Sequence, residues 1–347
     1  MQRIDDRIAA FGLCMVTLTA WGPNPFGSQA YMLAVCGLAA LSVVAGDFFV
    51  TVLGLYLCAW LSWIQSAGVV GMMSADAVIW GIDATPLLMA AMGLYVLIRN
   101  GRASVDFWKN SICVLAVVLA VLGLLQYRNV GQATATLGCT NFLGAFLAAS
   151  APFFFRRGWL FLLPIILWAL WLTHTATAIA ALCIGTGFYL WRWRGAALAV
   201  IPGLLYCVFF KGFASLSERV TFWTDAAAKV SAHWYSILFG FGPGVPWQAD
   251  NTLHSVPVYL LFNLGITGLL MAVGYVATRK YRDRLLSSAI LVLIVDGLAN
   301  LWTHTAPTAY LAAAIFALND REACVLNRDP AGPDSRPVSL RTPGGMY

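Results

Sequence analysis

The sequence is short of charge. Only 10% of its 347 residues are Asp, Glu, Lys or Arg, whereas 60% are hydrophobic. A soluble globular domain carries about 25% charged residues, so this chain lacks the polar side chains that a water-covered surface requires. A lipid solvent removes that requirement if every backbone hydrogen bond is satisfied within a helix. The composition therefore excludes a soluble domain with a single anchor and predicts an all-α, multi-spanning membrane protein.

The usual sequence signatures of disulfides and metal sites are also missing. No two of the eight cysteines form a CxxC pair and most lie in apolar runs, so we interpret them as small hydrophobic residues. No HExxH sequence occurs, and the four histidines have few carboxylates nearby. We therefore expect neither a metal nor another cofactor. The net charge of +6 fits cytoplasmic loops better than nucleic-acid binding.

Long apolar runs fill the chain instead. At roughly 20 residues per span, the length accommodates about twelve transmembrane helices in one bundle. The first resembles a short signal peptide, but Asp5 and Asp6 interrupt its basic region and further spans follow, which favours an uncleaved helix. The predicted spans are 8–21, 30–46, 49–67, 83–98, 111–127, 140–155, 158–173, 175–190, 196–210, 255–277, 285–302 and 305–318.

The distribution of Lys and Arg gives the orientation. With the N-terminus in the cytoplasm, all but four of the 21 Lys and Arg residues fall in cytoplasmic loops or tails, as the positive-inside rule requires. Both termini are then cytoplasmic, and the longest periplasmic segment, 211–254, joins the ninth and tenth spans. Residues 1–320 form a single transmembrane domain, and 321–347 form a cytoplasmic tail that we expect to be disordered.

The four exceptions are Arg128, Lys211, Arg219 and Lys229, and three of them share the 211–254 loop, which ends at His254. Isolated external arginines often extend to lipid headgroups. A cluster of them also suits an anionic headgroup, because the guanidinium forms paired hydrogen bonds with phosphate oxygens. The neutral imidazole of His254 either accepts a proton near pH 7 or only hydrogen-bonds the loop closed.

One carboxylate lies deep within a predicted span. Asp296 falls in the apolar run 291–298, and a charged group there has to face the bundle interior and find a partner. Asn300, one helical turn further on, is the expected partner. The sequence leaves two roles for Asp296 open: a structural hydrogen bond, or a part in a functional site.

A motif begins at His254. His254-Ser255 is followed by nine residues and then by Gly265-Ile266-Thr267-Gly268. This resembles the pattern His-[Asn/Ser/Gln]-x9-Gly-x-x-Gly of the O-antigen ligase family, which is related to the O-antigen polymerases and the bacterial protein O-oligosaccharyltransferases. The resemblance covers roughly residues 120–320. Three further segments are similar to the family in its order: Gly123–Gln126 leading to Leu137–Gly144 with Asn141, Arg219–Trp223, and Gly240–Gly244.

The sequence departs from the family at one point. Relatives usually carry an arginine after a threonine at the external start of a middle helix, whereas this chain reads Leu-Thr-His-Thr-Ala-Thr over 172–177. If that arginine holds the donor diphosphate in relatives, another cation has to replace it here. The candidates are His174, Arg128 and Lys211.

The resemblance implies a GT-C-like membrane glycosyltransferase of the bacterial inner membrane with its site facing the periplasm. The donor would be a glycan on polyprenyl (undecaprenyl) diphosphate, and the acceptor a hydroxyl of a lipid A core sugar, a nascent polysaccharide or a protein Ser or Thr. Membrane lipids are further partners, and nucleic acid is not expected. Two other hypotheses stay open: a transporter or flippase for lipid-linked sugars, and an inactive relative that acts as a scaffold.

Roles follow for individual residues. Arg219 would stabilise the leaving diphosphate and His254 would deprotonate the acceptor, which makes them the catalytic candidates. Asn141 is expected to cap a helix or brace a hairpin, and Gly265 and Gly268 to allow close helix packing. The full set of supporting residues is Asn141, Trp223, Gly242, Asp250, Ser255, Gly265, Gly268 and Asp296.

Overall fold

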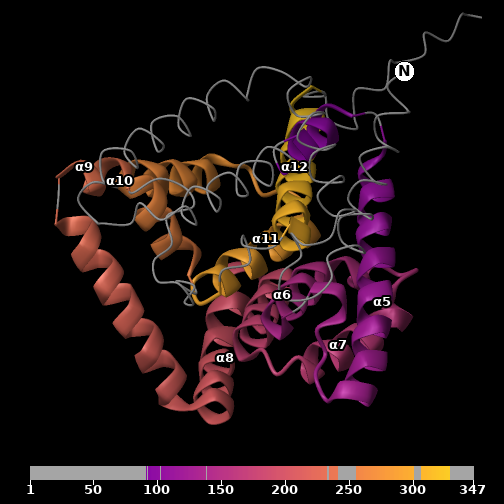
Figure 1. The fold of residues 1–347 in the computed structure, drawn as a ribbon. Coiled ribbons are helices and arrows are strands. Elements are labelled where there is room, and N and C mark those ends of the chain that lie inside the picture. The colour runs from indigo at the N-terminus through magenta and orange to yellow at the C-terminus, as the bar shows by residue number, and fades with distance from the viewer. Residues whose placement is uncertain are drawn as a thin grey trace, which may run out of the picture.

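The computed structural model describes residues 91–328 apart from positions 92, 102, 138, 233, 241–254 and 301–305. These residues form helices and turns and contain no strand, which confirms the all-α prediction for this part of the chain. The spans predicted at 8–21, 30–46 and 49–67 lie outside the described residues. A helical stretch at 93–100 precedes the labelled elements of Figure 1. They are α5 (Val105–Val130), α6 (Thr140–Ser150), α7 (Leu163–Leu172), α8 (Ala176–Ser231), α9 (Trp234–Phe239), α10 (Val256–Thr278), α11 (Arg284–Gly297) and α12 (Ala306–Arg328).

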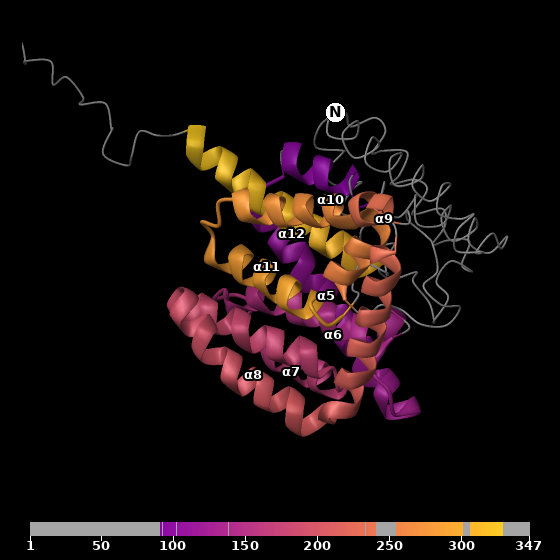
Figure 2. The same cartoon turned by 90° about the vertical axis from the view of Figure 1, so that its left-hand side faces the viewer.

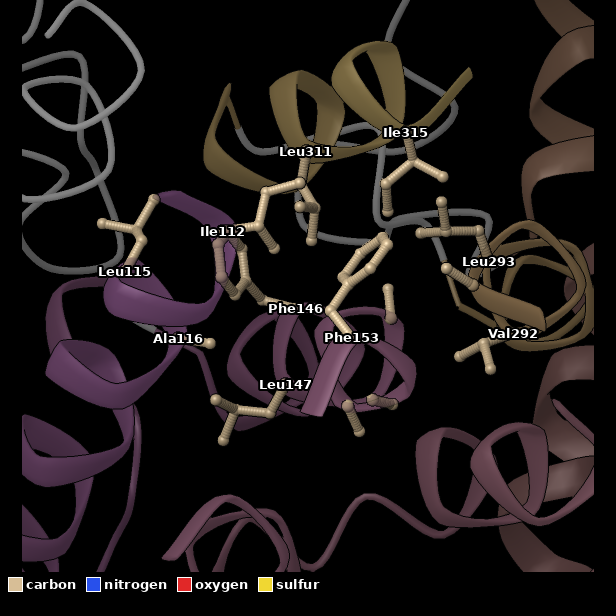
Figure 3. Packing of buried hydrophobic residues seen from close by; sticks show 14 of the residues in the cluster. Ile112, Leu115, Ala116, Phe146, Leu147, Phe153, Val292, Leu293, Leu311 and Ile315 are labelled. Atoms are coloured by element: carbon tan, nitrogen blue, oxygen red, sulfur yellow. The ribbon is translucent and has the colours of Figure 1, made fainter. Parts of the chain in front are cut away.

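Helix α6 forms the centre of the bundle. Every residue from Leu143 to Ser150 is buried, and many are alanines, so neighbouring helices approach it on all sides. The chain continues through a 3₁₀ segment, Ala151–Phe155, and a second one, Leu160–Leu162, leads into α7. Figure 3 shows Phe146 and Phe153 projecting from this central segment toward Ile112, Leu293 and Leu311, which belong to α5, α11 and α12. Helix α11 lies between α12 and α8 (Figures 1 and 2).

Helix α8 folds back on itself in a tight hairpin. Arg192 has a left-handed backbone with φ of +56°, and beyond it the chain returns along its own first arm. A Cβ added at Gly195 would lie 2.0 Å from the carbonyl oxygen of Gly187, so only glycine permits this approach. Further along, Gly203 packs beside Ala180. The two arms correspond to the spans predicted at 175–190 and 196–210. Figure 2 shows α8 doubling back below α11 and then climbing to α9.

Helix α12 extends beyond its predicted span of 305–318. It continues to Arg328, eight residues beyond position 320, where the transmembrane domain was predicted to end and the tail to begin. The charged residues of this extension have partners within the fold, which explains why it stays helical. Asp320 accepts from Tyr95 and pairs with Arg279 at 3.3 Å, and Arg321 donates to the carbonyl of Ile98.

A buried ion cluster joins three helices near this extension. Lys109 of α5 is 5% exposed and pairs with Asp283, the N-cap of α11, and with Glu322 of α12 at 3.0 Å. Burial by itself would raise the pKa of Asp283, but the Lys109 ammonium and the N–H groups of Leu285 and Leu286 hold this pKa below its usual range. The cluster thus fastens α5, α11 and α12 together at one end.

The polar contacts of the described residues divide between two ends of the bundle. At one end are the Lys109 cluster, the Arg279–Asp320 pair and the Arg156–Asp106 pair at 3.0 Å. All of these residues lie in segments predicted to be cytoplasmic or at the cytoplasmic ends of predicted spans. At the other end, the Thr175 hydroxyl donates a hydrogen bond to the backbone of α6, and Arg219 donates one to the carbonyl of Ala299. These residues lie in segments predicted to be periplasmic or at the periplasmic ends of predicted spans.

The hairpin of α8 generates one prediction. Gly195→Ala places a methyl group within the van der Waals radius of the Gly187 carbonyl, so the arms must separate. Overpacking of this kind destabilises by about 1–3 kcal/mol. We expect a lower melting temperature for the purified protein in detergent. Gly158→Ala is the matched control, since a Cβ there meets nothing within 4 Å. Equal melting temperatures for the two variants would contradict the hairpin.

The ion cluster generates a second prediction. Lys109→Met leaves two neighbouring carboxylates without their cation, a change that destabilises by about 3–5 kcal/mol when a buried pair is broken. The deficit in melting temperature relative to wild type should be largest at neutral pH. It should shrink as pH falls below about 4, because Asp283 and Glu322 then lose their charge. Lys280→Met, which alters an exposed lysine, is the control. A pH-independent deficit would argue against the cluster.

Candidate functional site

Arg219 is held at the C-terminal end of α11. It lies in the last part of α8, and its guanidinium donates to the carbonyl oxygen of Ala299 just beyond α11. The guanidinium also interacts electrostatically with the carboxylate of Asp296. The carbonyl end of a helix carries partial negative charge, so both partners favour a cation here. Arg219 is half-buried and lies at the end of the bundle that is predicted to be periplasmic.

A buried polar network adjoins Arg219. Asp296 is 1% exposed and accepts from the side-chain amide of Asn300 at 2.7 Å, which confirms the expected partner one turn on. The same amide nitrogen donates to the hydroxyl of Thr177 at 2.5 Å. Thr177 belongs to the first turn of α8, so the network ties the start of α8 to the end of α11. Nothing in the sequence singles out Thr177 beyond its place in the Thr-His-Thr-Ala-Thr stretch.

Asn141 braces two helix starts and does not cap its own helix. The N-cap of α6 is Cys139, which makes no side-chain cap bond. The hydroxyl of Thr175 lies 3.4 Å from the Asn141 carbonyl oxygen Oδ1 and donates to the backbone oxygen of Thr140 at 3.1 Å. Of the two expected roles, the structure supports the brace. A Cβ at Gly144 would lie 2.8 Å from Thr175, which explains the glycine of this segment.

The Thr175 brace also fixes the neighbouring histidine. His174 is exposed, and its φ of +53° is unusual for a residue other than glycine. Thr173 and Thr175 on either side are buried and hydrogen-bonded. Their contacts hold the histidine in a strained conformation at the start of α8, close along the chain to Thr177.

Gly265 interrupts α10. Its φ of +65° and ψ of −167° lie in a region that only glycine occupies readily. The interruption tips the side chain of Leu264 over Gly268, where an added Cβ would meet it at 2.2 Å. Gly265 therefore breaks the helix and Gly268 accommodates that break, while their expected role in packing between helices stays a prediction. The close contact between elements comes from Gly240 after α9, whose Cβ would lie 2.4 Å from the backbone of Asn263.

The start of α10 packs against the same part of the chain that carries Arg219. Ala226 and Val230 of α8 contact Phe262 of α10, and they follow Arg219 by seven and eleven positions. At 3.6 residues per turn these three residues share one face of the helix. Ser255 is buried and is the N-cap of α10. Helix α10 therefore lies against the face of α8 that carries Arg219.

Other predicted site residues lie elsewhere or are not described. His254, Asp250 and Gly242 fall outside the described residues, as does the side chain of Lys211. Arg128 is exposed in the last turn of α5, which ends at Val130 and is capped by Gly131. Trp223 is half-buried one turn after Arg219. The structure thus brings together Arg219, Asp296, Asn300 and Thr177. A second group consists of Asn141 and Gly144 of α6 with Thr175, which lies two residues before Thr177.

Metal-binding geometry is not found in the described part of the chain, where no three His, Cys, Asp or Glu residues gather closely enough to hold an ion. No protein-family model matches the chain, and no curated protein matches it.

The broken helix gives a third prediction. Gly265→Ala forces a Cβ into a backbone conformation that costs non-glycine residues about 1–3 kcal/mol. We expect a lower melting temperature and altered packing of α9 on α10. Gly274→Ala, in the same helix and with nothing within 4 Å of its Cβ, should be neutral or stabilising because alanine favours helices. If both variants melt at the same temperature, α10 is continuous at Gly265.

Proposed function

We propose that this chain is a polytopic membrane glycosyltransferase that transfers a glycan from a polyprenyl-diphosphate donor to an acceptor hydroxyl at the periplasmic face of the inner membrane. The observation that carries the proposal is the position of Arg219. It comes from the segment 211–254, yet it is held against Asp296 and Ala299 at the end of α11. The motif segments around Asn141 and Gly265 lie on helices that contact α8.

Surface chemistry supports the membrane part of the proposal. Helices α5 and α10 are long and apolar enough to cross a membrane. On α5 the exposed face is itself apolar, with Val114, Val118, Val121 and Leu125 at helical spacing, while the opposite face is buried. A helix that is hydrophobic all round belongs in a core or a bilayer. Further exposed apolar side chains are Leu167, Trp168, Leu198, Ile201, Leu204, Leu205, Leu270 and Val273.

The division of polar contacts between two ends supports the twelve-span arrangement. An apolar surface runs along α5, α8 and α10 between the Lys109 cluster and the Arg219 cluster. Polar groups confined to two opposite ends are expected for a bundle whose middle lies in hydrocarbon. The predicted alternation of inside and outside loops over residues 99–328 agrees with this division. We assign the Arg219 end to the periplasm because the other end carries most of the Lys and Arg.

The chemistry is a displacement at the anomeric carbon of the donor sugar. The acceptor oxygen forms a bond to that carbon, the bond to the diphosphate oxygen breaks, and the acceptor proton passes to a base. His254 is placed immediately before the buried Ser255 and is our assigned base. Arg219 stabilises the negative charge that develops on the diphosphate. His174, Arg128 and Lys211 are the further candidates for diphosphate contact.

One observation favours a second candidate, a transporter or flippase for lipid-linked sugars. Transporters often place interrupted helices at their substrate sites, and α10 is interrupted at Gly265. Gly265 lies two residues before the midpoint of this 23-residue helix, which is the depth at which transporters place such breaks. An inactive relative that acts as a scaffold is the third alternative.

The fourth prediction separates these alternatives. The purified protein in nanodiscs is given a polyprenyl-diphosphate oligosaccharide and a hydroxyl acceptor, and product is followed by mass spectrometry. His254→Ala should lower turnover about 10²–10⁴-fold, the typical contribution of a general base. Arg219→Gln should lower it about 10²–10³-fold. The control is Arg194→Gln at the exposed α8 hairpin, at the opposite end of the bundle.

Each alternative has its own outcome in this experiment. If the wild type turns over and the His254→Ala variant does so equally well, His254 is not the base. Absence of turnover with movement of the labelled lipid across the bilayer would identify a transporter. Absence of both activities would leave the scaffold.

A further inference from the structure

Two hydrogen-bond acceptors beside Arg219 have no donor. The side-chain nitrogen of Asn300 donates its two hydrogens to Asp296 and Thr177. The side-chain oxygen of Asn300, Oδ1, accepts no hydrogen bond. Asp296 accepts from Asn300 through Oδ1, and its carboxylate also interacts with the Thr177 hydroxyl and the Arg219 charge, while Oδ2 has no hydrogen-bond partner of its own. Asn300 is 3% exposed and Asp296 is 1% exposed. Buried acceptors without donors are rare and unfavourable, by about 1–3 kcal/mol each.

The chemistry of the cluster restricts what can satisfy these acceptors. An anion alone is unsuitable, because both oxygens would repel it. A hydroxyl group is suitable because its O–H donates to an acceptor. The neighbouring guanidinium of Arg219 adds a preference for negative charge close by. A ligand that carries a phosphate next to hydroxyl groups meets both demands, and a sugar attached to diphosphate is such a ligand.

We propose that Asn300 and Asp296 form the binding site for the first sugar of the lipid-linked donor, with their free oxygens accepting hydrogen bonds from its hydroxyl groups. The hydroxyl on carbon 2 is the principal donor, since carbon 2 adjoins the anomeric carbon that carries the diphosphate. The inference rests on the proposed function, because that function supplies the diphosphate held by Arg219. It adds a determinant of sugar recognition on α11, a helix outside the motif segments.

The experiment compares three probes on the full-length protein in nanodiscs: polyprenyl diphosphate alone, polyprenyl-diphosphate glucose and polyprenyl-diphosphate 2-deoxyglucose. A hydrogen bond to a buried acceptor contributes about 0.5–1.5 kcal/mol, which corresponds to roughly a 2- to 12-fold change in affinity. For the wild type we expect the glucose lipid to bind several-fold more tightly than either other probe. The 2-deoxy probe tests the site without any change to the protein.

Variants then place the effect on Asn300. Asn300→Leu removes one of the two acceptors and should reduce the preference for the glucose lipid over the other two probes. Arg219→Gln should weaken all three together. Asn110→Leu makes the same chemical change at the opposite end of the bundle, where Asn110 accepts from Arg156 and Trp159, and it should retain the preference for glucose.

The outcomes distinguish the two proposals. If the wild type binds the three probes equally, the sugar site is refuted, a result expected if water alone fills it, while binding of diphosphate stands. If the wild type binds none of them, both the sugar site and the proposed function fail. If Asn300→Leu keeps the wild-type preference, the hydroxyl groups are recognised elsewhere and the inference is overturned.

Discussion

Confinement of polar contacts to the two ends of an apolar bundle is the constraint on which this structure depends. With so few charged residues, the chain places them where helices end, and each end is closed by a different kind of contact. The Lys109 cluster ties three helices through full ionic charges. At the opposite end, Arg219, Asp296 and Asn300 use hydrogen bonds that leave acceptor oxygens free. The first arrangement is internally satisfied, whereas the second is suited to a ligand.

Helix identity followed largely from the sequence because apolar length alone decides it. Predicted spans at 111–127, 140–155, 158–173 and 255–277 correspond to α5, α6 with its 3₁₀ extension, α7 and α10. The turn at Arg192 falls between the spans predicted at 175–190 and 196–210. The Gly187–Gly195 contact was not predicted, since close approach depends on which helix faces which. The length of α12 was missed because its charged residues have partners that are distant in sequence.

The candidate site was predictable only in part. Arg219 stood out as a cation on the unexpected side, and Asp296 as a carboxylate in an apolar run with Asn300 one turn away. Their meeting is a tertiary fact, since 80 positions separate Arg219 from Ala299. Thr175 and Thr177 did not stand out in the sequence, because threonine is an ordinary residue at the start of a helix. The glycines near α10 were expected to pack helices, yet Gly265 breaks one, since φ values cannot be read from a glycine's position alone.

The central claim is that the two polar ends face opposite sides of a membrane, with Arg219 on the outer side. The most direct measurement is labelling of single cysteines by a membrane-impermeant maleimide in right-side-out spheroplasts, in a background without native cysteines. His174→Cys reports the exposed start of α8 and Arg192→Cys the exposed hairpin tip. The account predicts that position 174 reacts in intact spheroplasts and position 192 only after permeabilisation. Reaction of both positions from the same side would contradict it.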